Sequence, residues 1–359
     1  MSVSTMRAGE LTDASATQAV PGFPSRDRCL VMGIVNVTPD SFSDGGAYLA
    51  AASAIKHGLA LARSGADIID VGGESTRPGA SRVTAAGERR RVLPVVRELS
   101  AAGLTVTIDT TRSRVAEAAL AAGAAGINDV SGGLADPAMA RLAAEAHVPY
   151  IAMHWRGPSR DMQQRAVYTD VVAEVAAELR SRLESLLQAG IDRRQLVLDP
   201  GLGFAKQPAH NWQLLNRLAE LRALGQPVLI GASRKAFLGA LLRSGDHAPA
   251  PPARDMATAA VSALAAAAGA YCVRVHDIPG TLDAVRVAAE WTTPQFDPAA
   301  QKEAPAGAAA KNATLTVGDP PDHASQARRA HPSKSDNGII KDQRNLMFTL
   351  KGSRAWHRK

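Results

Sequence analysis

The chain has 359 residues, of which 46% are hydrophobic and 4% aromatic, a size that allows one large domain with tails or two ordinary domains. No apolar run is long enough to span a membrane, and residues 1–28 lack the basic and then apolar order of a secretory signal. We therefore expect a cytoplasmic protein with no membrane partner. Cys29 and Cys272 stand at or near the start of apolar runs, which predicts two buried thiols.

The net charge of +7 is concentrated at one end of the chain. Residues 293–359 contain 11 Lys or Arg against 6 Asp or Glu, so the tail accounts for +5 and the remainder is nearly balanced. A modest charge without regularly spaced aromatic residues argues against nucleic-acid binding as the main function. The mixed, aperiodic order of the tail predicts disorder, and a short partner-binding or anion-binding element around 346–350 is the alternative.

Residues 1–28 have no sustained periodicity, which predicts a flexible leader. From Cys29 onward a short β-branched run, a polar loop and an Ala- and Leu-rich helical stretch follow one another repeatedly. The predicted strands are 29–35, 67–72, 104–109, 124–129, 148–153, 195–199, 227–232 and 271–276. The predicted helices are 51–64, 85–101, 112–122, 137–146, 168–189, 210–224, 254–268 and 280–291. Four glycines are expected as helix C-terminal caps: Gly65, Gly103, Gly123 and Gly190.

Strands that alternate with helices predict right-handed βαβ units and a parallel sheet. Eight such units in about 260 residues match a closed (β/α)8 barrel. An open, doubly wound sheet would also hold eight units, but it usually binds a nucleotide at a Gly-rich turn, and no G-x-G-x-x-G follows residue 35. We therefore predict an α/β fold with a single TIM barrel over 29–292, between the leader 1–28 and a disordered basic tail over 293–359.

Polar side chains stand at the ends of nearly all the predicted strands. In such a barrel these ends meet at one face, where the active site lies. One buried polar residue is usually a hydrogen-bonded structural partner, but stability does not require most strands to end this way. We therefore expect a polar cup for a ligand rich in donors and acceptors, lined by Asn36, Glu74, Asp109, Asn128, His154, Asp199, Lys235, Arg274 and His276.

The residue types indicate what the cup binds. Asp109, Asn128 and Asp199 are suited to a heterocycle with an amidine-like N–H edge, because a carboxylate accepts two parallel N–H bonds. Lys235 adds a cation at the level of a ring nitrogen or carbonyl. His154 and Glu74 receive no role from the sequence.

The first, seventh and eighth strand ends indicate anion chemistry. Arg274 and His276 are suited to phosphate oxygens. Asn36 offers Mg2+ one oxygen ligand, which is enough because this ion keeps several waters and leans on substrate phosphates. The turn at Ser233 opens a helix whose N-terminal amides favour a carboxylate.

Six segments resemble the signature segments of the dihydropteroate synthase family of folate biosynthesis: MGIVNVTPDSFSDGG, DVGGESTRPGA, INDVSGG, LDPGLGFAK, GASRKAFLGALL and VRVHD. The spacing is similar to that of actinobacterial members, includes an MHWR segment, and covers residues 29–291. The resemblance implies a transferase that joins 6-hydroxymethyl-7,8-dihydropterin pyrophosphate to p-aminobenzoate. The products would be 7,8-dihydropteroate and pyrophosphate, with Mg2+ as cofactor. It also implies a sulfonamide target and a homodimer packed through outer helices far from the strand ends.

The resemblance also assigns roles to residues. It implies that the pterin is held by Asp109, Asn128, Met153, Asp199, Gly203 and Lys235, of which Asp109, Asp199 and Lys235 act in catalysis. Pyrophosphate would be bound by Thr76, Arg274, Val275 and His276, and Mg2+ by Asn36. The p-aminobenzoate pocket would be lined by Phe42, Thr76, Arg77, Pro78, Phe204, Ser233 and Lys235. The loops 38–43 and 76–79 would close over the site.

The chemistry of that reaction favours ionisation before bond formation. The carbon that bears the pyrophosphate is benzylic-like, so the pterin ring stabilises a cation there. Asp199 would stabilise the positive charge, and Mg2+, Arg274 and His276 would neutralise the departing pyrophosphate. The aniline nitrogen is already nucleophilic and needs no strong general base.

Two features depart from the family pattern. Ala236 follows Lys235 where many relatives carry Ser or another polar or basic residue, and we expect it to tune loop packing without abolishing activity. The tail has no counterpart in the pattern, and its role stays open, as does sulfonamide susceptibility.

Three alternatives stay open. A catalytically weak paralogue that binds pterin or regulates should have lost pieces of the lid loops or of the Ser-Arg-Lys turn, and this chain has both. A pterin-binding methyltransferase would not need Asn36 with its Thr-Pro-Asp-Ser-Phe loop. The third is a nucleic-acid binder that acts through the tail.

Overall fold

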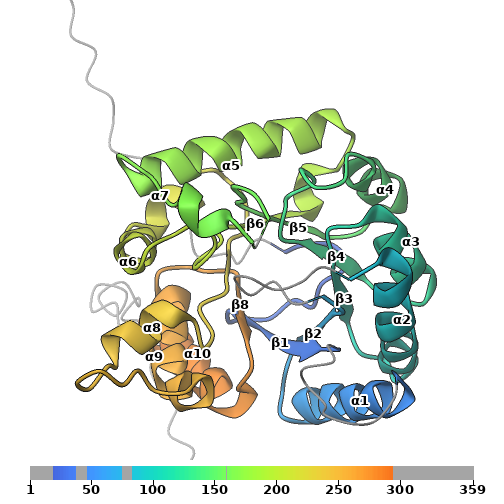
Figure 1. Ribbon diagram of the computed structural model, residues 1–359, viewed down its shortest axis with the longest axis horizontal. Coiled ribbons are helices and arrows are strands. Elements are labelled where there is room, and N and C mark those ends of the chain that lie inside the picture. Colours follow the sequence, from blue (N-terminus) through green and yellow to red (C-terminus); the bar gives the residue numbers. More distant parts are fainter. Residues whose placement is uncertain (1–18, 38–46, 75–82, 159, 294–359) are drawn as a thin grey trace, which may run out of the picture. The chain divides into compact units, whose positions relative to one another are not determined.

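The strands close into a barrel. The computed structural model describes residues 19–37, 47–74, 83–158 and 160–293, the side chains of 47–49 excepted. Eight parallel strands form one sheet in the order β6-β5-β4-β3-β2-β1-β8-β7, and a parallel bridge between Leu198 and Val228 joins its two edges. Helices surround the strands (Figure 1), which confirms the predicted (β/α)8 barrel.

Each strand overlaps its predicted range. The strands are β1 (Leu30–Asn36), β2 (Ile68–Gly72), β3 (Val106–Asp109), β4 (Gly126–Asp129), β5 (Tyr150–Met153), β6 (Leu196–Asp199), β7 (Leu229–Ile230) and β8 (Cys272–Val275). The α-helices are α1 (Ala47–Arg63), α2 (Ala85–Ala101), α3 (Ser113–Ala121), α4 (Ala138–Ala146), α5 (Val171–Gln188), α6 (Pro208–Asn216), α7 (Leu218–Arg222), α8 (Ala236–Leu241), α9 (Asp255–Ala267) and α10 (Ile278–Thr292). Short 3-10 turns cover Met162–Arg165, Arg193–Gln195 and Pro251–Arg254.

Two helices differ from the prediction. The predicted helix 210–224 is divided into α6 and α7, because Arg217 between them leaves the helical region with φ −113° and ψ 34°. The six-residue α8 has no predicted range of its own, since it is too short to show a full helical repeat. The four expected C-terminal glycines do have positive φ, as a left-handed cap requires: Gly65, Gly103, Gly123 and Gly190.

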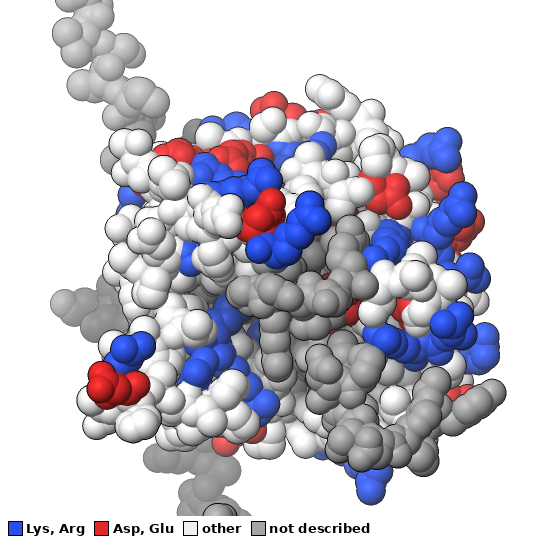
Figure 2. Space-filling model, in the orientation of Figure 1, with Lys and Arg blue, Asp and Glu red and all other residues white. Residues whose placement is uncertain are grey.

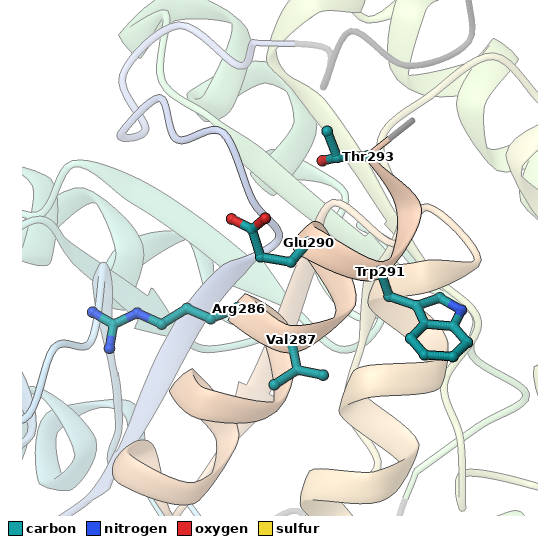
Figure 3. A pocket seen from close by; sticks show the side chains of 5 residues that line it. All are labelled: Arg286, Val287, Glu290, Trp291 and Thr293. Carbon is teal, nitrogen blue, oxygen red and sulfur yellow. The ribbon is translucent and has the colours of Figure 1, made fainter. Parts of the chain in front are cut away.

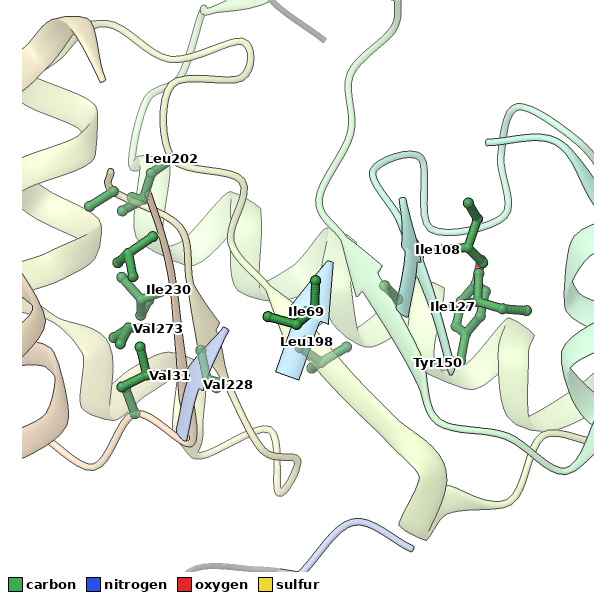
Figure 4. Packing of buried hydrophobic residues seen from close by; sticks show 14 of the residues in the cluster. Val31, Ile69, Ile108, Ile127, Tyr150, Leu198, Leu202, Val228, Ile230 and Val273 are labelled. Carbon is green, nitrogen blue, oxygen red and sulfur yellow. The ribbon is translucent and has the colours of Figure 1, made fainter. Parts of the chain in front are cut away.

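Side-chain alternation divides the core into two layers. Inside the barrel, one buried cluster is formed mainly by Leu30, Met32, Ile68, Ile151, Val197, Leu229 and Cys272. Their neighbours along the strands point outward and pack against the helices, as Val31, Ile69 and Ile127 do (Figure 4). The alternation follows from the period of two in a β-strand, and it fixes which residues can reach the interior.

The folded part begins before residue 29. Val20 is buried in the inner cluster and Phe23 packs against it, while the guanidinium of Arg28 contacts Asp67 through two hydrogen bonds of 2.7 and 3.1 Å. Residues 19–28 therefore belong to the barrel and not to a flexible leader. The apolar residues at the amino end of the barrel interior need a cover, which periodicity along one chain segment does not reveal.

The other end of the chain lies mostly outside the described residues. The contacts divide the chain into Met1–Asp297 and Pro298–Lys359, and the second unit lies wholly outside, so the predicted disordered tail stays a prediction. Within the described ranges, no helix is long and apolar enough to cross a membrane. Cys29 and Cys272 are free and buried, which confirms the predicted thiols.

Candidate active site

The inward positions change character along the strands. After the apolar inner layer, the next inward residues toward the carboxyl ends are polar, and they include Asp70, Asp109, Asn128, Asp199 and Arg274. Strand register aligns them, because Asp109 pairs with Asn128 and Met153 pairs with Asp199. The sequence therefore folds several distant polar residues into one cup, as predicted from the strand ends.

Arg274 lies within the cup. Its Nε donates to Asp70 at 2.6 Å and its Nη2 to Asp109 at 2.8 Å. Asp70 also accepts from Asn128 Nδ2 at 2.9 Å and from Thr107 Oγ1 at 2.6 Å. The prediction grouped Arg274 with His276 for pyrophosphate, but in this structure its guanidinium sits with the residues predicted to hold the pterin.

Asp70 anchors this group, and the sequence reasoning assigned it no role. Its carboxylate is fully buried and binds Arg274, Asn128 and Thr107. Strand alternation could have found it, since it stands two residues after the inward-facing Ile68. By contrast, Asp129 points outward, where it accepts bonds from Tyr150 and Ser131 and is a structural residue.

The Asp109–Arg274 pair has an unusual charge balance. One guanidinium is shared by two carboxylates. Burial raises the pKa of Asp109, the attraction of Arg274 opposes this rise, and the negative charge of Asp70 adds to it. Burial also opposes the charge of Arg274, but Asp70 and Asp109 outweigh it and raise the pKa of Arg274. A ligand that donates N–H bonds to Asp109 would supply the partners that the carboxylate now shares.

A second group surrounds Asp199 at the end of β6. Asp199 Oδ1 accepts the Gly201 amide at 2.7 Å, and burial raises the pKa of Asp199 against the attraction of Lys235. Burial lowers the pKa of Lys235 to about 8. Lys235 Nζ donates to the Leu202 carbonyl and lies 4.8 Å from the centre of the Phe204 ring. Three predicted site residues are thus brought together.

Gly203 and Met153 support that group. Gly203 has φ +79°, and a Cβ there would lie 3.1 Å from Lys235 Cδ, so a glycine leaves room for the lysine stem. Its amide donates to Asn211 Oδ1 at 2.7 Å, which fixes the loop. Met153 is buried in register with Asp199. Both residues therefore lie next to the group around Asp199 and Lys235, and their role in binding pterin stays a prediction.

The turn after β7 joins the last strand. Ser233 Oγ accepts the His276 amide at 3.1 Å and lies 2.8 Å from His276 Nδ1. Arg234 has φ +58°, a conformation rare for a side chain of this size, and a bidentate ion pair with Asp255 (2.7 and 2.8 Å) holds it there. Ala236 is exposed at the first position of α8.

Several predicted residues stand apart. Val275 faces the helices in the outer hydrophobic layer, so its predicted role in binding pyrophosphate is wrong for its side chain. Four predicted p-aminobenzoate contacts lie outside the described residues: Phe42, Thr76, Arg77 and Pro78.

The structure gives partners to the two residues that had no role. His154 Nε2 lies 2.9 Å from Glu178 Oε2, and its Nδ1 lies 3.0 Å from the ammonium of Lys206, a buried residue that the sequence reasoning missed. Glu74 Oε2 accepts from Arg112 at 2.7 Å and from the Val83 amide at 3.1 Å.

Basic side chains lie around the open face of the barrel. Figure 2 shows Lys and Arg gathered over α2 and α3 and beside α8 on the face viewed. Asn36 is exposed at the carboxyl end of β1. Among the described residues there is no group of three or more His, Cys, Asp and Glu that could hold a metal ion.

A closed barrel whose polar cup presents Asp109, Asn128, Asp199 and Lys235 is the fold and site of an enzyme that binds a flat, donor-rich heterocycle. The model of the pterin binding enzyme family matches residues 32–276. The dihydropteroate synthase of Mycobacterium leprae is 56% identical over 263 residues, which cover 73% of this chain and 93% of the relative. The chain belongs to the dihydropteroate synthase family, whose members are transferases of folate biosynthesis.

Solved structures agree with this assignment. Dihydropteroate synthase from Xanthomonas albilineans in complex with 7,8-dihydropteroate has a TM-score of 0.66 at 44% identity, covering 74% of this chain and 95% of that one. The Yersinia pestis dihydropteroate synthase with a sulfonamide drug complex has a TM-score of 0.70 at 37% identity, covering 76% and 98%.

Proposed function

We propose that this chain condenses 6-hydroxymethyl-7,8-dihydropterin pyrophosphate with p-aminobenzoate, releasing 7,8-dihydropteroate and pyrophosphate. The observation that carries the proposal is the convergence of Asp109, Asn128, Asp199 and Lys235 at one barrel mouth. Relatives of the same family with 7,8-dihydropteroate and with a sulfonamide drug support the substrate class. The weak-paralogue alternative is not favoured, because the similar curated relatives and solved structures are dihydropteroate synthases.

Pterin binding would rearrange Arg274. Its Nη2 donates to Asp109 Oδ2, so a pterin N–H edge at Asp109 would compete with it for this oxygen. We infer that the pterin replaces this bond and releases part of the guanidinium toward the pyrophosphate. Asp70 retains the Nε bond and keeps Arg274 in the cup. Arg274 would thus bind Asp109 before the pterin arrives and the pyrophosphate afterwards, as its predicted role requires.

Asn36 is suited to be the one protein ligand of a Mg2+ ion that also binds the pyrophosphate. Its amide is exposed at the strand end that opens toward the cup, and oxygen donors suit this ion. Mg2+ would neutralise negative charge on the leaving pyrophosphate. His276, held by Ser233, lies at the end of the last strand and would donate to the same anion.

The charges of the cup suit a cationic intermediate. Asp199 would face the guanidine-like edge of the pterin and stabilise positive charge on the ring while the carbon–oxygen bond breaks. Phe204 and Ser233 would orient p-aminobenzoate so that its amine attacks the cation, and the proton leaves from the amine nitrogen afterwards. No strong base is required, since the aniline amine is already nucleophilic.

Positional isotope exchange tests this order of events. Pterin pyrophosphate is labelled with 18O at the oxygen that joins the pterin methylene carbon to the first phosphorus. It is incubated with protein and Mg2+ but without p-aminobenzoate. Reversible ionisation should move the label into non-bridging positions, because the bound pyrophosphate turns before the bond re-forms. Turnover with p-aminobenzoate but no exchange of the label would contradict an ionisation-first reaction.

We further propose a homodimer that covers α9 and α10. The exposed fractions of Met256, Leu264, Val287 and Trp291 are 85%, 72%, 63% and 85%, an unusual set of exposed apolar side chains on two adjacent helices. Figure 3 shows Val287 and Trp291 beside Arg286 and Glu290 at a surface pocket on α10. Sedimentation should give a dimer for the wild type and a larger monomer fraction for Trp291→Glu. A monomeric wild type would contradict the proposal.

The cysteines bear on the cellular compartment. Two free, buried cysteines suit a reducing compartment, and we propose the cytoplasm on this ground.

A further inference from the structure

Lys206 is a buried lysine whose described hydrogen-bond partners are both neutral. Its side chain is 3% exposed, and Nζ lies 3.0 Å from His154 Nδ1 and donates to the Phe204 carbonyl at 3.1 Å. Removing an ammonium from water is costly, whereas a methionine would fill a similar volume without that cost. Stability alone therefore does not call for a lysine here.

Lys206 ends a chain of contacts that begins on α5. Glu178 of α5 binds Arg156 and His154, and His154 contacts Lys206. Burial and the neighbouring Lys206 lower the pKa of His154 to about 4. The imidazole is therefore neutral, with Nε2 donating to Glu178 and Nδ1 accepting from Lys206.

A second contact reaches the same loop from the same side. The Tyr168 hydroxyl donates to the Ala205 carbonyl at 3.0 Å, and the Arg156 guanidinium lies 3.8 Å from the centre of the Tyr168 ring. Ala205 has φ +49°, a conformation that alanine rarely adopts and that the flanking bonds maintain. The backbone around 204–206 is thus fixed from α5 through two routes.

The fixed loop is the one that positions Lys235. Leu202 presents its carbonyl to Lys235, and Phe204 presents its ring. We propose that Lys206 is a positioning residue, which holds the 200–206 loop so that Phe204 and Lys235 form the p-aminobenzoate side of the site. The inference rests on the proposed function for the identity of that substrate.

The charged groups around Lys206 lie on the same side of the cup as the 200–206 loop. Burial lowers the pKa of Lys206 to about 7; Asp199 and Glu178 raise it, while Lys235 and Arg156 lower it. The ammonium in turn opposes the rise that burial causes in the pKa of Asp199. By contrast, Asp109 at the end of β3 and Asn128 in β4 form their side-chain hydrogen bonds with Arg274 and Asp70. A change at Lys206 should therefore act first on the side of the cup formed by Phe204 and Lys235, and more weakly on pterin binding, which Asp109 and Asn128 also support.

Steady-state kinetics of Lys206→Met test the proposal. We expect KM for p-aminobenzoate to rise about tenfold, the effect of losing roughly one net hydrogen bond. KM for the pterin pyrophosphate should rise clearly less, because Asp109 and Asn128 keep their bonds to Arg274 and Asp70. Lys206→Gln keeps one donor and should give an intermediate rise, and it carries the test if the Met variant does not fold. Lys56→Met, the same change at an exposed lysine of α1, is the matched control.

Hydrogen exchange gives a readout that does not depend on turnover. The Gly201 and Gly203 amides donate to Asp199 and Asn211, and both should exchange faster in the Lys206 variants than in the control. An unchanged KM for p-aminobenzoate, or a loss of kcat with both KM values unchanged, would overturn the positioning role. Absence of turnover in the wild type and in Lys56→Met would instead contradict the proposed function, and exchange at the two glycines would still decide the role of Lys206.

Discussion

At the scale of single residues, function depends on whether a strand side chain points into the barrel or out toward the helices. Asp129 and Asn128 are neighbours in β4, yet the first is bound by Tyr150 and Ser131 in the outer layer and the second contacts Asp70 in the cup. Strand alternation separates them although their polarity is similar. The same rule places Val275 outside the cup and Arg274 inside it.

Replacement of Asp199 tests the pterin assignment. Asp199→Ala should abolish measurable pterin binding, because a buried, donor-rich ring edge loses its carboxylate acceptor. Calorimetric titration with the pterin measures this, and Asp192→Ala, at a half-buried aspartate before β6, is the control. Tight pterin binding that survives in a folded Asp199→Ala variant would show that the cup is misassigned.

The pKa of Lys235 predicts a pH dependence. Burial lowers it to about 8, so the free protein loses this positive charge as the pH rises through 8, whereas an ordinary lysine stays charged. We expect kcat/KM to fall above about pH 8, since this ratio reports groups of the free enzyme. A profile that is flat from pH 7 to 10 would mean that the charge of Lys235 is not needed.

At the scale of elements, periodicity predicted the strands and the glycine caps because these depend on local sequence. The range of α8 was not predicted, because six residues are too few to show a full helical repeat. The break at Arg217 was not predicted either, and its guanidinium contacts the distant Asp170. In the site, Asp109, Asn128, Asp199 and Lys235 were predicted from the strand ends. Asp70 was missed although strand alternation marks it as inward-facing, since it stands two residues after Ile68. Lys206 was missed because its partner His154 is brought near only by the folded barrel.

The segment 19–28 is an element that the sequence pattern concealed. Val20→Ala should lower the free energy of unfolding by about 1–3 kcal/mol, since it removes buried methyl groups from the inner cluster. Val167→Ala, at a valine that is 75% exposed, should change it by less than about 0.5 kcal/mol. Denaturant unfolding of the two variants compares them, and equal stability would place residue 20 outside the core.

At the scale of the whole molecule, the barrel carries the predicted chemistry and the matched family region. The family model ends at residue 276, before the unit Pro298–Lys359. A chain that ends at residue 297 should therefore keep kcat and both KM values within about twofold of the full chain, because no predicted contact comes from the removed part. A tenfold loss would assign the tail a part in the reaction.

The central claim is that the cup catalyses the condensation. Purified full-length protein is mixed with 6-hydroxymethyl-7,8-dihydropterin pyrophosphate, p-aminobenzoate and Mg2+, and pyrophosphate release is followed together with 7,8-dihydropteroate. The account predicts multiple turnovers, with one pyrophosphate released for each dihydropteroate formed. Bound pterin without pyrophosphate release would contradict it and would make the chain a pterin-binding protein without this activity.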